Sequence, residues 1–499
     1  MKKTTLLLAI LLFASPIVLA QKTKAKQLDA MIQKGMTDWE IPGLVTVVVK
    51  DGETVFQKAY GVKNLESKAP VDEHTLFTMA STTKAIVCQA LGILVDQGKL
   101  NWTDKVREHL PYFKLSDAYL TEEARIQDLL THNLGIEQAD LLWAIDSVST
   151  KETLNRFAFS QKTYPVRAGF DYNNIMYAAA GEVIEAVSGQ HWTEFVAENI
   201  FKPVGMHDAV AKSADIFKKG NYTTPYLNDL DDGIVQVDYN LSDQIGAAGM
   251  IWSSMSDVTN YLKYLVNDGV VGNDTILSKN TFDYLFKPHA FGTDASFYPT
   301  QQLTNPNWKT YGLGWFQHDY RGEKLDFHTG SIGGLIAICG IIRDKNVAVY
   351  VFANMDHAEL RHAILYKSMD LFVFDDDSRN WHEEVFELYS KFKEQEKDYY
   401  RKLRDEKVAD TKTTLRLEKY EGEYSHPMLG KATVKNTGAG LIINFNDFLM
   451  LPIQHWHYDT FMSTKENPYR AQIDFNFKIG TDATVKSFDA FDETFTKQN

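Results

Sequence analysis

Strand-forming segments occur in two widely separated parts of the chain, and this arrangement constrains the fold more than any other feature. Residues 42–62 contain two β-branched or aromatic runs around Asp51-Gly52, a dipeptide typical of tight hairpin turns. Strand patterns resume at about 311–354, and the residues between these regions are mostly helical in pattern. We therefore expect one α/β (α+β) domain whose sheet is assembled from distant parts of the chain.

The composition changes after about residue 373. Residues 375–408 are highly charged and have the pattern of an amphipathic connector helix. From about 415 onward, short alternating runs predict an all-β module, either a sandwich or a small antiparallel barrel of lipocalin-like type. The expected organisation is a leader at 1–20, a main domain at 22–373, a connector at 374–410 and the β module at 411–499.

The first twenty residues have the pattern of a secretory signal peptide. Two lysines precede an apolar run from Leu6 to Phe13, and small residues end the segment at Ala20. The run is too short for a membrane anchor, and no later stretch has the length and apolar character of a spanning helix. We expect an exported protein, periplasmic or secreted after cleavage near Ala20, with no stable membrane anchor.

Charge and cysteine content narrow the function classes. The 499-residue chain carries a formal net charge of −14, which argues against nucleic acid as a partner. Its two cysteines, Cys88 and Cys339, both lie in strongly apolar segments. Export permits a disulfide between them, but the pattern favours two buried free thiols.

One helical segment combines features that stability alone does not explain. The segment that begins at Ser81 and ends near Gly98 is apolar on nearly every side, yet it carries Lys84 in its first turn. A cation is unfavourable at that end of the helix dipole. The i, i+3 spacing places Ser81 and Lys84 on one face, and burial would lower the pKa of the lysine. This is what a base for a serine nucleophile requires, whereas a capping serine beside a snorkelling lysine is the structural alternative.

Three motifs in order resemble the serine β-lactamase and penicillin-binding-protein superfamily. They are Ser81-Thr82-Thr83-Lys84, Tyr172-Asn173-Asn174 and His328-Thr329-Gly330. The resemblance covers roughly residues 40–372 and is nearest to class C β-lactamases, DD-peptidases, D-aminopeptidases and the esterases of this fold. It implies a β-lactamase/transpeptidase-like domain in which an antiparallel sheet packs with a helical region, the third motif lying on the sheet edge beside the serine.

The resemblance also implies a role for each motif residue. Ser81 would form an acyl-enzyme, and Lys84 and Tyr172 would share the proton transfers, with the acylation base left open between them. Asn174 would hold Lys84 and an amide of the acyl group. The backbone amides of Ser81 and Ser331, beside Gly330, would form the oxyanion hole. Neither a metal nor an organic cofactor is implied.

His328 departs from the lysine that β-lactamases carry in the third motif. Histidine is largely neutral at pH 7 and would hold a substrate carboxylate less strongly. We therefore expect an exported serine hydrolase acting on a small ester, amide or peptide. The alternatives are a β-lactamase, an acyltransferase using the same acyl-enzyme, or a penicillin-binding sensor with negligible turnover. The acyl, leaving and acceptor groups and the oligomeric state stay open.

Several similar patterns have simpler explanations. A second Ser-x-x-Lys, Ser390 to Lys393, lies in the charged connector. Tyr226-Leu227-Asn228 lies in a polar segment and is interpreted as a surface turn. His455 and His457 alternate on one strand face, and the sequence offers no evident third metal ligand near them.

Overall fold

The computed structural model describes residues 21–292, 297–438, 440–465 and 472–498. The chain divides into two compact units. The first contains the residues up to 101 together with 187–241 and 247–391, and the second contains 102–186, 242–246 and the residues from 392 onward. The predicted signal peptide at 1–20 lies outside the described residues.

An antiparallel sheet forms the centre of the first unit, as the sequence predicts. Its strand order is β2-β1-β14-β13-β12-β11-β10-β9, so the N-terminal hairpin pairs with a strand from the end of the domain. The strands are β1 (Gly43–Lys50), β2 (Glu53–Gly61), β9 (Ala290–Phe291), β10 (Lys309–Tyr311), β11 (Phe316–Tyr320), β12 (Glu323–Ile332), β13 (Leu335–Ile342) and β14 (Val347–Ala353).

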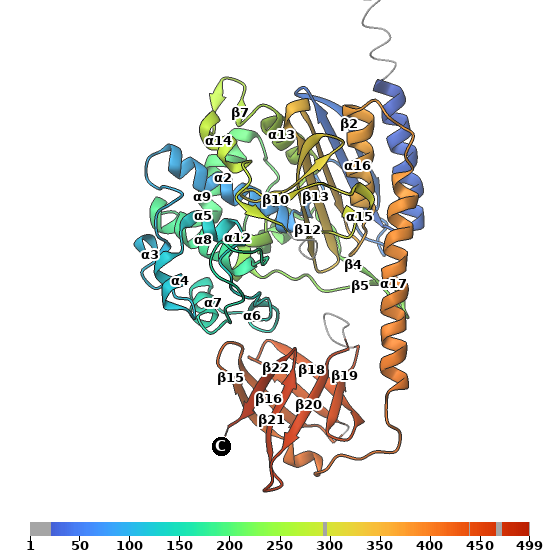
Figure 1. Cartoon of the computed structure of the whole chain (residues 1–499). Helices are drawn as coiled ribbons and strands as arrows, with labels where there is room; N and C mark the ends of the chain where they lie inside the picture. The colour runs from blue at the N-terminus through green and yellow to red at the C-terminus, as the bar shows by residue number, and fades with distance from the viewer. Residues whose placement is uncertain (1–20, 293–296, 439, 466–471, 499) are drawn as a thin grey trace, which may run out of the picture. The chain divides into compact units, whose positions relative to one another are not determined.

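Helices pack against the central strands. Helix α13 (Met255–Val266) contacts β1 and β14, and α16 (Leu360–Val373) contacts β13 and β14 (Figure 1). Every residue of β13 and β14 is buried. The side chains on both faces of these strands are therefore covered. This explains why their sequences are continuously apolar, whereas a strand with one exposed face would alternate apolar and polar residues.

The apolar segment that contains Ser81 is a buried helix, preceded by a tight turn. A 3-10 turn, η1 (Ala80–Thr82), leads into α2 (Thr83–Asp96), of which Thr83 through Leu94 are buried. Gly98 has a positive φ of 68° just beyond the helix end. Ser81 lies in η1 and no side-chain cap is present at the start of α2, so the capping explanation for this serine is wrong.

The second unit contains a set of short helices and a β-barrel. The helices are α3 (Val106–His109), α4 (Ala118–Glu123), α5 (Ile126–Leu130), α6 (Leu141–Ala144), α7 (Thr150–Phe157) and most of α8 (Asn174–Ser188). Helix α8 begins at the asparagine of the second motif.

The C-terminal segment forms a closed antiparallel barrel. Its strands are β15 (Gly422–His426), β16 (Gly430–Asn436), β17 (Leu441–Phe445), β18 (Leu449–His457), β19 (Thr460–Ser463), β20 (Asp474–Ile479), β21 (Val485–Ala490) and β22 (Glu493–Lys497). Phe445, Phe475, Phe488 and Phe495 are fully buried, and the rings of Phe488 and Phe495 stack 5.0 Å apart. The predicted fold class, a mixed α/β domain followed by a small barrel, is confirmed.

Two details of the sequence analysis change. Tyr226-Leu227-Asn228 is not a turn but part of strand β4 (Tyr226–Asp229), which pairs with β5 (Gly233–Gln236). Tyr226 is buried, and its hydroxyl accepts a hydrogen bond from the Leu65 amide. The connector helix is shorter than the charged segment at 375–408: α17 spans Trp381–Asp405.

Both cysteines are buried and neither forms a disulfide within the described residues, as expected. Cys88 lies on α2 and Cys339 on β13. Among the described residues, no helix combines the length and the apolar character needed to cross a membrane.

Candidate active site

Ser81 and Lys84 form a close pair in the first unit. The Lys84 Nζ donates a hydrogen bond of 3.0 Å to Ser81 Oγ and another of 2.6 Å to the Ala248 carbonyl. Lys84 is fully buried, whereas Ser81 is partly exposed. A buried amine held against an accessible hydroxyl can take the proton of that hydroxyl when it attacks a carbonyl carbon.

The backbone just before Ser81 adopts a conformation that side chains rarely take. Ala80 has a φ of +44°, in the left-handed region where a Cβ is disfavoured. Neighbouring contacts fix this turn, because the Met79 amide donates to the Ile251 carbonyl at 2.8 Å and the Thr82 hydroxyl donates to the Met79 carbonyl at 2.7 Å. Ser81 therefore lies between a strained residue and the regular helix α2.

Glycines let three other segments approach this turn. A Cβ on Gly330 would lie 2.6 Å from the Ser81 nitrogen, and one on Gly314 would lie 2.9 Å from the Ala85 nitrogen. A Cβ on Gly249 would meet the Ala80 carbonyl carbon at 3.4 Å. The glycine of the third motif is therefore a packing requirement, since any side chain there would push β12 away from the nucleophile turn.

The third motif occupies the part of β12 that has lost one neighbour. Strand β12 lies inside the sheet, but its pairing with β11 ends at Phe327. Residues 328–332 continue to pair with β13. His328, Gly330 and Ser331 thus lie on a local edge of the sheet, and Ser331 is exposed.

His328 is neutral and held by the protein. Its Nδ1 contacts the Thr329 carbonyl at 2.6 Å and its Nε2 contacts the Tyr311 hydroxyl at 3.0 Å. Burial, together with the charge of Lys84, lowers the pKa of His328 to about 3. The imidazole is therefore uncharged near neutral pH and offers no cation to a substrate carboxylate, in line with the sequence expectation.

A buried ion pair between Arg361 and Glu359 is hydrogen-bonded to β12. Arg361 on α16 donates to the Gly330 carbonyl at 2.5 Å and to Ser331 Oγ at 3.1 Å. Its other guanidinium nitrogens bind both carboxylate oxygens of Glu359, at 2.9 and 3.1 Å. Burial opposes the charged form of Glu359, but Arg361 outweighs it and holds the pKa of that carboxyl well below its usual range. Sequence analysis missed both residues, which lie outside the motifs.

Tyr172 and Asn174 belong to the second unit. The Tyr172 ring lies 4.3 Å from the His132 ring, and Asn174 Nδ2 donates to the two carboxylate oxygens of Asp140 at 3.1 and 3.2 Å. His132 Nδ1 also accepts from the Asn173 amide at 3.0 Å. His132 and Asp140 therefore position the second motif, and both lie outside the three motifs identified in the sequence.

The remaining sequence candidates lie elsewhere. Ser390 and Lys393 are on α17. His455 Nε2 contacts the Tyr458 carbonyl, and His457 Nδ1 accepts from the Val408 amide. Neither histidine belongs to a group of three potential metal ligands within the described part of the chain.

The antiparallel sheet and the buried Ser-x-x-Lys turn against β12 define a protein with the β-lactamase type of fold. Solved structures agree in fold. A penicillin-binding protein homologue from Pyrococcus abyssi, described as octameric, superposes with a TM-score of 0.63 at 22% identity over 95% of this chain and 99% of its own. The chain belongs to the Beta-lactamase family, whose sequence profile matches residues 28–371.

Other similarities extend the comparison. Residues 406–499 match a domain of unknown function, DUF3471. Unguisins hydrolase ungD' of Aspergillus campestris is 26% identical over 423 residues, covering 81% of this chain and 76% of its own. Protein flp of Staphylococcus aureus is 24% identical over 336 residues, covering 66% of this chain and 63% of its own. Family membership and a relative named as a hydrolase together support hydrolase activity in general terms.

Proposed function

We propose that the protein is a serine hydrolase that forms an acyl-enzyme on Ser81 and cleaves small esters, amides or peptides. The observation that carries the proposal is the hydrogen bond of 3.0 Å between the buried Lys84 amine and the partly exposed Ser81 hydroxyl. The relative named as a hydrolase supports hydrolysis as the net reaction.

In acylation, Ser81 Oγ bonds to the carbonyl carbon of the substrate while its proton passes to one of the two candidate bases, Lys84 or Tyr172. Assigning Tyr172 and Asn174 to this step rests on the motif order in the sequence. The tetrahedral oxyanion is stabilised by the amides of Ser81 and Ser331, an arrangement worth about 3 kcal/mol of barrier in other acyl-transfer enzymes. The bond to the leaving alcohol or amine then breaks, and that group takes up the proton.

In deacylation, a water molecule gives a proton to the same base and its oxygen attacks the acyl carbon. Cleavage of the ester bond to Ser81 releases the acid and restores the hydroxyl. The neutral His328 favours substrates that do not depend on a carboxylate beside the scissile bond. An alcohol or amine in place of water would give acyl transfer, and a β-lactam as the acyl donor would give β-lactamase activity.

Intact-protein mass spectrometry tests the proposal. Purified protein is incubated with a penicillin and with activated esters of graded chain length. We expect a mass increase of one acyl group in the wild type and none in Ser81→Ala. Ser390→Ala removes the serine of the other Ser-x-x-Lys pair, on α17, and should label like the wild type. Equal labelling of wild type and Ser81→Ala would refute the assignment of the nucleophile.

The lifetime of the adduct separates the candidate functions. Rapid loss of the ester-derived adduct with persistence of the penicillin adduct indicates an esterase or peptidase. Rapid loss of both indicates a β-lactamase, and persistence of both indicates a penicillin-binding sensor. A higher rate of ester consumption with added alcohols, together with formation of the new ester, indicates acyl transfer.

Export is proposed on the pattern of residues 1–20. The mass of the chain recovered from the periplasm or medium of an expressing bacterium provides the test. Cleavage near Ala20 predicts a mature chain that begins at Gln21, whereas a full-length chain retained in the cytoplasm would contradict export.

A further inference from the structure

The segment that leads into α3 is held in place by backbone hydrogen bonds. The Asp104 carbonyl accepts from the Ile126 amide at 3.0 Å, and the Val106 amide donates to the Ala124 carbonyl at 2.9 Å. Between them, Lys105 forms a β-bridge with Arg125. The backbone on both sides of residue 105 is therefore fixed against the start of α5.

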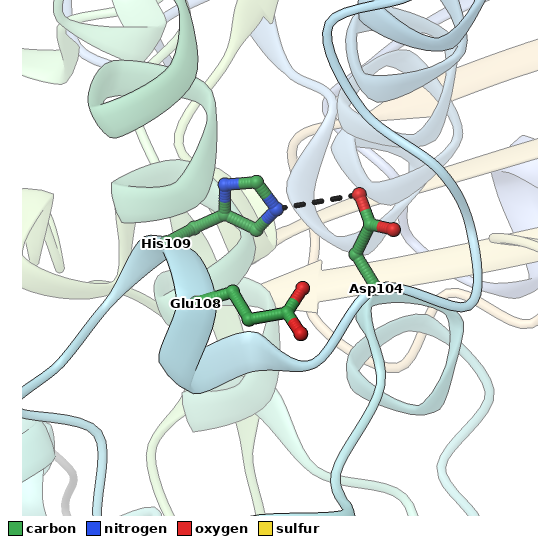
Figure 2. A group of neighbouring side chains, drawn as sticks. All are labelled: Asp104, Glu108 and His109. Atoms are coloured by element: carbon green, nitrogen blue, oxygen red, sulfur yellow. Dashed lines mark ion pairs between the residues drawn. The ribbon is translucent and has the colours of Figure 1, made fainter.

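Three side chains of this segment gather into one cluster, drawn in Figure 2. They are Asp104, Glu108 and His109, and one potential ligand atom from each lies within 4.8 Å of the other two. His109 Nε2 and an oxygen of Asp104 lie 3.4 Å apart. Zinc–ligand distances of about 2.0–2.2 Å in a tetrahedral site place neighbouring ligand atoms about 3.4 Å apart.

The histidine nitrogen that faces the cluster has no hydrogen bond. His109 Nε2 is buried and has no hydrogen-bonding partner among the residues that the structure describes. A buried imidazole nitrogen without a partner is costly, and its alignment with a carboxylate at 3.4 Å is too long to compensate fully. A metal ion bound at the cluster would give this buried nitrogen a partner.

The adjacent cations are engaged with other acids. Lys105 pairs with Glu123 at 2.5 Å, and Arg107 pairs with Glu122 at 2.6 Å. Both partners lie on α4, outside the cluster. Lys105 and Arg107 therefore direct their charges toward α4 in these ion pairs.

We propose that Asp104, Glu108 and His109 bind a divalent transition-metal ion of the zinc type. The imidazole of His109 and one oxygen from each carboxylate supply three ligands, and water completes the site. An imidazole selects against Ca²⁺ and Mg²⁺, which prefer oxygen ligands alone. Glu108 is exposed and can move the short distance needed to close the site. The ion joins α3 to the preceding segment and stabilises the fold, independently of the hydrolysis proposed at Ser81.

Zinc titration of untagged, chelator-treated protein tests the site. Isothermal titration calorimetry in a buffer that does not bind metal should give one Zn²⁺ per chain, and excess Ca²⁺ should not displace it. His109→Gln and Glu108→Gln should each weaken binding about tenfold or more. Because Glu108 is exposed, the Glu108→Gln substitution should leave the fold intact. Zn²⁺ should raise the thermal unfolding midpoint of the wild type but not of either variant.

The barrel offers a matched control. His426 pairs with Glu493 at 3.2 Å and belongs to no three-ligand group within the described part of the chain, so His426→Gln should bind Zn²⁺ like the wild type. Absence of stoichiometric binding would overturn the proposal, as would binding that survives His109→Gln unchanged or that is lost equally in His426→Gln. Because the readouts are binding and unfolding, failure of the hydrolase assignment would leave this result unaffected.

Discussion

The backbone of Gly330 lies so close to Ser81 that a Cβ at residue 330 would stand 2.6 Å from the Ser81 nitrogen. The same Cβ would meet the Ala80 side chain at 2.6 Å and the Met79 carbonyl at 2.8 Å. None of these atoms is the end of a flexible side chain. The strand and the nucleophile turn can therefore keep this spacing only while residue 330 is glycine.

Replacing Gly330 by alanine should damage activity more than folding. The Cβ would displace the Ser81 amide from the proposed oxyanion position, and we expect acylation to slow about 100- to 1,000-fold. Overpacking should also cost about 1–3 kcal/mol of unfolding free energy. Single-turnover acylation and urea unfolding measure the two effects.

Gly480→Ala is the matched control for this change. At Gly480 the added Cβ would meet mainly the flexible Lys486 side chain, at 2.5 Å, within the barrel. We expect wild-type acylation in this variant. Unchanged acylation in Gly330→Ala would contradict the proposed role of the close approach.

Removing Arg361 should be strongly destabilising. Arg361→Met would leave the Glu359 carboxylate buried without its partner, which typically costs about 3–5 kcal/mol. The double variant Arg361→Met/Glu359→Leu removes both charges and should recover part of that loss. Urea unfolding of the two single variants and the double variant forms the test, and strictly additive losses would show that the pair is not coupled.

Affinity for anionic substrates should not rise in mild acid through His328. With a pKa of about 3, this imidazole stays neutral as the pH falls from about 8 to 5. The KM ratio of a carboxylate-bearing ester to its neutral analogue should therefore be constant over that range. A fall in the ratio below about pH 6.5 that disappears in His328→Gln would mean that the ring does protonate in the complex.

His362 should make the fold sensitive to acid. Burial lowers the pKa of this ring to about 3, although Glu359 favours its protonated form. In the unfolded chain the pKa of this imidazole is about 6.5. As the pH drops below that value, the unfolded state binds a proton that the folded state does not, and the free energy of unfolding therefore falls. The loss reaches about 1.4 kcal/mol per pH unit for one proton.

His362→Leu tests this linkage. Both ring nitrogens of His362 are buried and have no hydrogen bond within the described residues. Leucine therefore removes the titrating group without the loss of a hydrogen bond. The unfolding free energy, measured from about pH 7 to 4, should fall less steeply in the variant. The difference between the two slopes should approach the value for uptake of one proton on unfolding. Parallel curves for wild type and variant would contradict the low pKa.

Local sequence pattern was sufficient for the elements and for the Ser81–Lys84 pair. A nearly continuous apolar helix has to be buried, and a lysine in the first turn of a buried helix is unusual. Both residues can therefore be identified from the sequence alone. The hairpin around Asp51-Gly52 and the alternating strands of the barrel follow from turn chemistry and period-2 patterns in the same way.

Features that depend on distant contacts were not predictable. The left-handed Ala80 carries no sequence mark, because the contacts of Met79 and Thr82 impose its conformation. The Glu359–Arg361 pair sits in an ordinary-looking helix start, and its importance appears only when β12 lies beside it. Tyr226 was mistaken for a turn residue because polar neighbours outweighed the one buried ring.

The pairing of β1 with β14 sets an order on the folding of the chain. Leu44 is opposite Ala353, so the strand that is synthesised first finds its partner only after nearly all of the domain has been made. Until then the largely apolar β1 has only the hairpin strand β2 beside it and presents an unpaired edge. Such non-local pairing folds slowly and leaves aggregation-prone surface in the meantime. Truncation anywhere before β14 therefore removes the strand that joins β1 to the rest of the sheet.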